Sequence, residues 1–289
     1  MPALLLAACA PTTIPAATRP APASEFVRQC AGKDGWNDPA PPVRVHGSTY
    51  LVGTCGISVV LIASPQGHVL IDSGTAAAAP LVAANVERLG LPMSDIRMIL
   101  SSHEHFDHVG GRAALQRLSG APVRASVKAG AVLASGKPLP EDPQSESLED
   151  IAPVRLGPPL QDGETVAVGP IRLTAYMMPG HAPGGTGWTW RSCEGRQCVT
   201  IAYRDSISAI SSERYRFADH PAYVATLRAT LDKVAALPCD LLITPHPGAS
   251  NLTDRLAGTA SLIEPGACRA YADRGRTGLN ARLAREAAR

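Results

Sequence analysis

Four side chains that can bind a metal ion lie within six positions of the sequence. The segment His103-Glu104-His105-Phe106-Asp107-His108 offers His103, His105, Asp107 and His108 as candidate ligands. Imidazole nitrogen and carboxylate oxygen suit zinc and other borderline metals. The apolar run before the segment predicts a strand that ends at Leu100. Closely spaced donors directly after a strand end would point into one cleft. A single histidine would more often be structural, but four donors together favour a metal site over a surface loop.

Two further histidines each follow a predicted strand. His181 lies in a Pro-Gly-His-Ala-Pro-Gly-Gly turn, and His246 lies in a Thr-Pro-His-Pro-Gly turn. Either alone is equally consistent with an ordinary turn residue, yet α/β sheets place their sites at strand ends. We therefore expect both in the site. Ordinary polar roles are predicted for the remaining histidines, His46, His68 and His220.

The segments around these residues predict strands alternating with helices. In the first half, β-branched runs between turn signals predict a hairpin-rich antiparallel sheet. These runs are Val43–Val45, Thr49–Val52, Ile57–Ile62 and His68–Ile71. A helix over Ala76–Leu91 and a strand over Ile96–Leu100 follow.

The second half repeats this order. Its predicted strands are Thr165–Val168, Ile171–Met177, Gly187–Trp190, Val199–Tyr203 and Leu241–Thr244, with a helix over Pro221–Leu237 before the last strand. Two such halves predict an α/β fold of two mixed sheets flanked by helices, an αββα sandwich. A final helix, Ala270–Ala288, is expected to pack outside. Residues 136–153 read as a long loop of the kind that is often functional.

Composition narrows the class of protein. The chain has 289 residues, 45% of them hydrophobic and 18% charged, which suits one catalytic domain with a large core. With 27 basic and 25 acidic residues the net charge is +2, which gives no basis for nucleic-acid binding. We therefore expect a small substrate and a monomeric enzyme.

The first residues predict export. Ala3–Cys9 has the apolar core and small-residue end of a signal peptide and is too short to span a membrane. Its end resembles the Leu-Ala-Ala-Cys box of bacterial lipoproteins, which implies a lipid anchor at Cys9. The positively charged residues that usually begin such a signal peptide are missing, so a start upstream of Met1 stays open. We assign residues 1–24 to leader and tether and 25–289 to a single catalytic domain. The expected location is the periplasm.

Seven cysteines in an exported chain predict disulfides. Cys9 is the odd one, because processing would remove or lipidate it. Six cysteines allow fifteen pairings, although Cys193 and Cys198 flank a short turn that a local disulfide would close. Reduced, buried thiols remain the alternative.

The metal motifs resemble the metallo-β-lactamase superfamily. His-x-His-x-Asp-His, Gly-His-x-Pro-Gly and a distal histidine carry the likeness, which runs from about Trp36 to Arg289. Further segments resemble subclass B3 metallo-β-lactamases, particularly AIM-type enzymes. These segments are Gly35–Pro39, Gly53–Ile57, Thr189–Cys193, Asp205–Ser206 and Thr244–Pro247. The resemblance also implies the disulfides Cys30–Cys55, Cys193–Cys198 and Cys239–Cys268.

The resemblance implies two zinc ions with three protein ligands each. One would take His103, His105 and His181, and the other Asp107, His108 and His246. No motif position is substituted.

Residues around the ligands receive roles by the same resemblance. Asp72 matches an aspartate that braces the histidine loop, with a strand-end cap as the alternative. Ser206 matches a serine that holds a metal-bound water. Ser208, Arg204 and Gln144 match positions near the substrate pocket, although each is equally expected as an ordinary polar residue.

This assignment implies hydrolysis without a protein nucleophile. Two zinc ions sharing one water lower its pKa and supply hydroxide, and no Ser-x-x-Lys motif lies in a context suited to a covalent serine route. The hydroxide would attack the β-lactam carbonyl of penicillins, cephalosporins or carbapenems, conferring antibiotic resistance. One zinc would polarise the carbonyl oxygen, and the other would bind the substrate carboxylate and stabilise the leaving nitrogen. Asp107 would be the catalytic residue that orients the hydroxide and carries its proton.

Two alternatives remain open on the sequence. A glyoxalase-like thioesterase or lactonase has the same metal motif, but in those relatives an aspartate near Asp205 bridges both metals. The export signal, the cysteines and the Trp190–Cys193 segment favour the lactamase. A non-enzymatic zinc-binding protein is disfavoured, because a structural zinc closes with four ligands and needs no open position.

Overall fold

The computed structural model describes residues 20–288, and the predicted lipidation site at Cys9 lies outside them. Two five-stranded sheets form the centre of the fold. The first has the order β1-β2-β3-β4-β5, in which only β5 runs parallel to its neighbour. Its strands are β1 (Val43–His46), β2 (Thr49–Leu51), β3 (Val60–Ile62), β4 (His68–Ile71) and β5 (Ile96–Leu100).

The second sheet has the order β10-β9-β8-β7-β6, and β10 runs parallel to β9 while the other pairs are antiparallel. Its strands are β6 (Thr165–Val168), β7 (Ile171–Met177), β8 (Thr186–Glu194), β9 (Gln197–Tyr203) and β10 (Leu241–Ile243). Both sheets are therefore mixed, as the sequence predicts.

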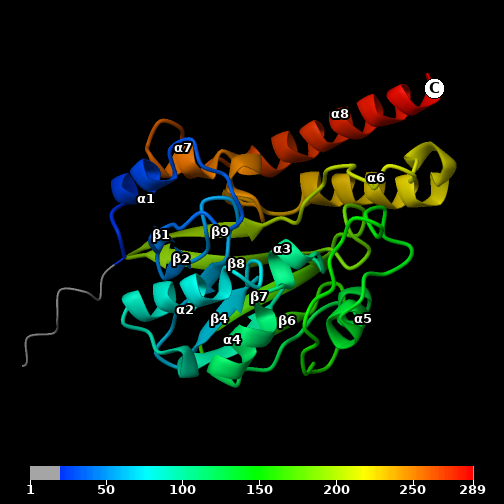
Figure 1. Cartoon of the computed structure of the whole chain (residues 1–289). Helices are drawn as coiled ribbons and strands as arrows, with labels where there is room; N and C mark the ends of the chain where they lie inside the picture. Colours follow the sequence, from blue (N-terminus) through cyan, green and yellow to red (C-terminus); the bar gives the residue numbers. More distant parts are fainter. Residues whose placement is uncertain (1–19, 289) are drawn as a thin grey trace, which may run out of the picture.

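Helices cover the outer face of each sheet (Figure 1). The α-helices are α1 (Ala23–Cys30), α2 (Ala79–Arg88), α3 (Phe106–Val109), α4 (Arg112–Ser119), α5 (Val127–Ser135), α6 (Pro221–Ala236), α7 (Leu252–Leu256) and α8 (Ala267–Ala287). Short 3-10 helices are η1 (Met93–Asp95), η2 (Phe217–Asp219) and η3 (Pro247–Ser250).

Side-chain alternation along the strands builds a layered core. In β3, Val60 and Ile62 face the core between the sheets, whereas Leu61 packs under α2, α4 and α5. In β9, Tyr203 faces the core between the sheets and Ala202 packs under α6 and α8. Since successive strand residues point to opposite faces, both faces of these strands are buried. The αββα sandwich is thereby confirmed.

Several element boundaries differ from the sequence prediction. The strand expected from Ile57 begins only at Val60, because the Ser58 amide donates to the Pro245 carbonyl of the other half instead of to a neighbouring strand (2.7 Å). Helix α1 begins at Ala23, inside the predicted tether.

Helices α4 and α5 were not predicted, since each is short. α5 is capped by Ser126 at its start and by Gly136 in the left-handed region at its end (φ 77°). Helix α8 is more buried than predicted. Its residues Tyr271, Ala272 and Leu279 pack with α6 over the second sheet.

Three disulfides connect the pairs that the resemblance implies, namely Cys30–Cys55, Cys193–Cys198 and Cys239–Cys268. The second closes the β8–β9 hairpin, where its cysteines are directly paired, and so lengthens both strands beyond the prediction. The third ties the start of α8 to the residues before β10. Within residues 20–288, no helix combines the length and hydrophobicity required to cross a bilayer.

Candidate metal centre

The candidate ligands meet at one edge of the sandwich, beyond the carboxyl ends of β5, β7 and β10. His103 and His105 follow β5, and Asp107 and His108 lie in the first turn of α3. His181 follows β7 and His246 follows β10. The site therefore draws on both sheets, at the kind of edge where α/β folds place their ligands.

His103, His105 and His181 form the first cluster. Each offers one ring nitrogen, and these nitrogens all lie within 4.8 Å of one another. All three side chains are buried. The Nε2 atom of His103 is buried without a hydrogen-bond partner, which is costly unless a cation accepts its lone pair.

Asp107, His108 and His246 form the second cluster. Asp107 Oδ2 lies 3.0 Å from His108 Nε2 and 3.4 Å from His246 Nε2, and the two nitrogens are 3.3 Å apart. His103, Asp107 and His108 also bring donor atoms within 4.8 Å of one another, so the two clusters adjoin.

Carboxylates hold the outer ring nitrogens of two histidines in the first cluster. His103 Nδ1 donates to Asp205 Oδ1 at 2.8 Å, and His105 Nε2 donates to Asp142 Oδ2 at 2.9 Å. Both carboxylates are buried. Such bonds fix the ring orientation and leave the inner nitrogen free for a metal, which is the usual arrangement around metal-binding histidines.

Backbone carbonyls do the same for two further histidines. His181 Nδ1 donates to the Ser208 carbonyl at 3.0 Å, and His246 Nδ1 donates to the Gly56 carbonyl at 3.1 Å. Their Nε2 atoms are thereby left for the clusters. The donor set and its orientation fit two metal ions with three protein ligands each.

Asp72 braces the histidine loop. Its carboxylate accepts bonds from the Ser102 amide (2.7 Å), the Ser102 hydroxyl (2.7 Å) and the Tyr203 hydroxyl (2.6 Å). Its Oδ2 also lies 3.4 Å from His108 Nδ1. The residue is fully buried with φ 68°, a conformation that costs free energy outside glycine. Asp72 thus does more than cap a strand, since it links both sheets to His108.

Most of the site histidines are held neutral. Burial, together with nearby histidines, lowers the pKa of His181 to about 3 and that of His246 to about 4. Burial and the neighbouring histidines place the pKa of His103 well below its usual range. Neutral imidazole is the form that binds a metal.

His108 and Asp107 form a charged pair. Burial opposes protonation of His108, but the Asp107 carboxylate raises its pKa to about 10. Burial would likewise raise the pKa of Asp107, yet His108 and His246 hold it well below its usual range. A cation at this cluster would replace the proton on His108 as the partner of the carboxylate.

Glu104 connects two ligand-bearing turns. Its Oε1 accepts a bond from the Gly184 amide at 2.8 Å, and burial raises its pKa to about 7. It joins the loop of His103 and His105 to the turn that carries His181, and so acts as a brace.

A cavity of about 400 Å³ opens beside His246. Ser206 and Ser208 line it together with His246. Gln144 does not line this cavity. Its backbone N–H donates to Asp142 Oδ1 at 2.7 Å, so it belongs to the turn that positions His105.

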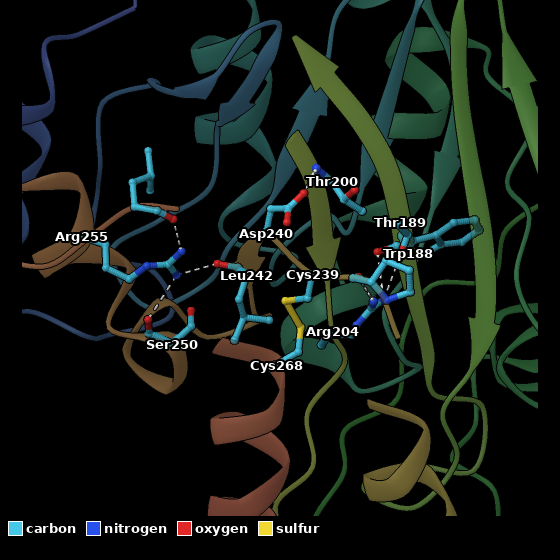
Figure 2. The surroundings of a disulfide bond; sticks show 12 residues. Trp188, Thr189, Thr200, Arg204, Cys239, Asp240, Leu242, Ser250, Arg255 and Cys268 are labelled. Atoms are coloured by element: carbon cyan, nitrogen blue, oxygen red, sulfur yellow. Dashed lines mark hydrogen bonds between the residues drawn. A yellow bond between two sulfur atoms is a disulfide. The ribbon is translucent and has the colours of Figure 1, made fainter. Parts of the chain in front are cut away.

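The placement of Arg204 near the substrate is wrong. Its side chain is fully buried, and its guanidinium donates to Thr189 Oγ1 (2.9 Å) and to the carbonyls of Trp188 (3.3 Å) and Pro238 (2.8 Å). Figure 2 shows it beside the Cys239–Cys268 disulfide. The cause is alternation, because Arg204 follows Tyr203 and therefore points to the opposite face of the sheet.

Sequence reasoning missed Asp142. It lies in the loop of residues 136–153, and its only signal was that loops of this length are often functional. Asp205, considered as a metal bridge, instead lies on the outer side of His103. This position separates the site from the bridging arrangement of the thioesterase alternative.

Comparison with known proteins agrees with this geometry. The family profile described as the metallo-beta-lactamase superfamily matches residues 52–246. Hydroxyacylglutathione hydrolase of Anaeromyxobacter dehalogenans is 30% identical over 208 residues, which cover 72% of this chain and 66% of that protein's length.

Solved structures give higher similarity. MIM-1, a metallo-β-lactamase from Novosphingobium pentaromativorans, is 48% identical over 92% of this chain and 98% of its own, with a TM-score of 0.89. MEM-A1, a subclass B3 metallo-β-lactamase from a soil metagenome library, is 46% identical over 88% of this chain and 99% of its own, with a TM-score of 0.85. The chain thus belongs to the metallo-β-lactamase superfamily, within subclass B3.

Proposed function

We propose that this enzyme is a class B β-lactamase, a hydrolase that opens the lactam ring of penicillins, cephalosporins and carbapenems with two zinc ions. The observation that carries the proposal is the pair of adjoining three-ligand clusters, in which four of the five histidines are held by a hydrogen bond through their outer nitrogen. Membership of subclass B3 supports the substrate class.

The residues suit two zinc ions. His103, His105 and His181 would hold one through neutral nitrogens, and Asp107, His108 and His246 would hold the other with one negative charge. Bound zinc lowers the pKa of a coordinated water and polarises a carbonyl oxygen.

Asp107 would orient the attacking water rather than store its proton. A carboxylate whose pKa lies far below neutrality accepts a hydrogen bond readily but is a poor resting place for a proton. Ser206, at the mouth of the cavity beside His246, would contribute a hydroxyl to the water structure there.

The thioesterase alternative is less favoured. The 30% identical hydroxyacylglutathione hydrolase makes a thioester the appropriate comparison substrate. However, Oδ1 of Asp205 accepts a hydrogen bond from the outer nitrogen of His103, which is the role of a brace and not of a bridge.

The test is hydrolysis of a chromogenic cephalosporin and of a hydroxyacyl thioester by the purified protein, with and without a chelator. We expect lactam turnover that the chelator abolishes and zinc restores, together with about two zinc ions per chain. His181→Ala should lose turnover, whereas His220→Ala, which changes an exposed histidine outside the clusters, should not. One tightly held ion without lactam turnover would contradict the proposal.

We also propose export to the periplasm, with the residues before α1 as leader and tether and Cys9 as a lipid anchor. The three disulfides support an oxidising compartment. Multiple acylation of a lipoprotein cysteine would anchor the chain firmly. If the protein expressed from its natural start is wholly soluble in the periplasm and Cys9→Ser changes nothing, the anchor is excluded.

A further inference from the structure

The cavity beside His246 extends away from the metal clusters along α8. One wall is the segment Ser206–Ile210, and the other is the face of α8 that carries Tyr271, Arg274 and Gly278. Because the same cavity touches His246 and α8, a substrate held at the clusters would direct one of its substituents along this helix.

The wall formed by α8 is positively charged. Arg274, Gly278, Arg282 and Arg285 follow one another at intervals of four, four and three residues, and therefore share one face of the helix. A second cavity of about 670 Å³ also includes Arg282 and Arg285 in its lining, together with Glu213 and Glu286, so the uniformly positive wall is confined to the first cavity.

Two of these arginines have no carboxylate partner in the described part of the chain. Arg274 donates to the Ala249 carbonyl at 3.0 Å and its guanidinium lies 5.7 Å from the centre of the Tyr271 ring, contacts that orient it without neutralising it. Arg285 forms no ion pair among residues 20–288. Arg282, in contrast, is neutralised by Glu286 at 2.5 Å.

The floor between the charges is apolar. Ile207, Ala209 and the half-exposed Ile210 contribute side chains. A Cβ atom at Gly278 would meet no other atom within 4 Å, so this glycine leaves the cavity open. The nearby Gly275 differs, because a Cβ there would approach Leu231 to 2.5 Å; that glycine serves the packing of α8 on α6.

We propose that this groove binds an anionic substituent carried outside the lactam ring, and that the enzyme favours β-lactams with an apolar substituent ending in a carboxylate or sulfonate. The inference rests on the proposed lactamase function. The apolar floor would take the stem. Arg274 would take the charge of a short substituent, and Arg285, about 16 Å further along the helix, that of a longer one. Both guanidinium groups face solvent, so each contributes modestly and salt weakens the preference.

The test uses matched β-lactams that differ only in whether the substituent ends in a carboxylate or in its primary amide. In one pair the carboxylate or amide ends the acyl side chain of the lactam. In a second pair it ends a substituent on the ring fused to the lactam. The ring carboxylate is common to both members, so its own contacts cancel in the comparison. The measured quantity is the ratio of kcat/KM for the anion to that for the amide.

We expect at least one pair to favour the anion, with a ratio that Arg274→Gln/Arg285→Gln lowers by about 3- to 10-fold, mainly through KM. Arg269→Gln, an exposed arginine of α8 outside the cavity, is the matched control and should leave the ratio unchanged. Gly278→Leu should raise KM for compounds with bulky substituents by filling the groove.

A binding measurement distinguishes failure of this inference from failure of the proposed function. The ring-opened forms of the same compounds are titrated calorimetrically into metal-free protein, where no turnover is needed. Absence of lactam turnover would overturn the proposed function, while the binding ratio would still test the groove. Three results would each overturn the inference. The anion and the amide could bind and turn over equally, the double substitution could leave the ratio unchanged, or Arg269→Gln could lower the ratio as much as the double substitution does.

Discussion

Asp107→Ala tests the division of the site into two metal positions. Asp107 supplies the only negative charge of the second cluster, with its Oδ2 3.0 Å from His108 Nε2 and 3.4 Å from His246 Nε2. The substitution removes one of three ligands there and none from the cluster of His103, His105 and His181. We therefore expect selective loss of the second metal ion.

The expected magnitude follows from the position of the carboxylate among the donor atoms. Replacing a residue that only supports a ligand typically weakens metal binding or activity about 10- to 100-fold. Direct loss of a charged ligand should cost at least the upper figure, or about 2.7 kcal/mol for the second ion. The fold should persist, because the sandwich core and the three disulfides do not involve Asp107.

The assay combines metal analysis after dialysis, circular dichroism and turnover at saturating substrate. Asp107→Ala should retain about one zinc ion per chain, a native spectrum and strongly reduced kcat. Asp150→Ala, which changes an exposed aspartate paired with Lys137, is the control and should match the parent protein. Two tightly bound ions with undiminished turnover would show that Asp107 is not a ligand and would return attention to Asp205.

Three further substitutions test other parts of the structure. Asp142→Ala should lower zinc affinity or activity about 10- to 100-fold by releasing the outer nitrogen of His105, and Asp142→Asn should rescue part of the loss; unchanged zinc affinity would contradict this role. Arg204→Met should lower the unfolding free energy by about 2–4 kcal/mol in denaturant titrations, because buried carbonyls lose their donor, while the KM of the folded fraction stays the same. Burial outweighs the nearby Asp95 and lowers the pKa of His68 from 6.5. The buried neutral ring therefore contributes its full stability to the fold above pH 6.5, and this contribution is lost as the pH falls. His68→Gln should therefore differ from the parent in the slope of unfolding free energy against pH below 6.5; parallel curves for two zinc-loaded proteins would refute this.

Local patterns in the sequence predicted the sheets and the place where the candidate ligands meet. Strands β4 and β5 have the predicted bounds, because short, mostly apolar runs between turn signals are strong local signals. The ligand segments follow strands directly, so the edge at which they meet could be inferred from topology. Helices α4 and α5 were missed because eight or nine residues contain too few turns for an apolar period to stand out.

Long-range contacts were harder to predict. Asp142 reaches His105 across 37 positions from a loop without periodicity, so no local pattern identifies the pair. The error at Arg204 was avoidable in principle. Since Ile201 and Tyr203 face the core between the sheets, Arg204 had to point to the other face.

The contribution of both halves to each cluster has a consequence for biosynthesis. His108 and His246 are 138 positions apart, so at about 5–20 residues per second the second half follows the first by roughly 7–28 s. During that interval the emerging chain exposes His103, His105, Asp107 and His108 first, His181 then completes the first cluster, and only His246 completes the second. Such an open donor set binds copper more strongly than zinc. On the proposed ligand assignment, the second cluster is complete only once His246 has joined the fold, so its choice between the two ions falls at the end of folding.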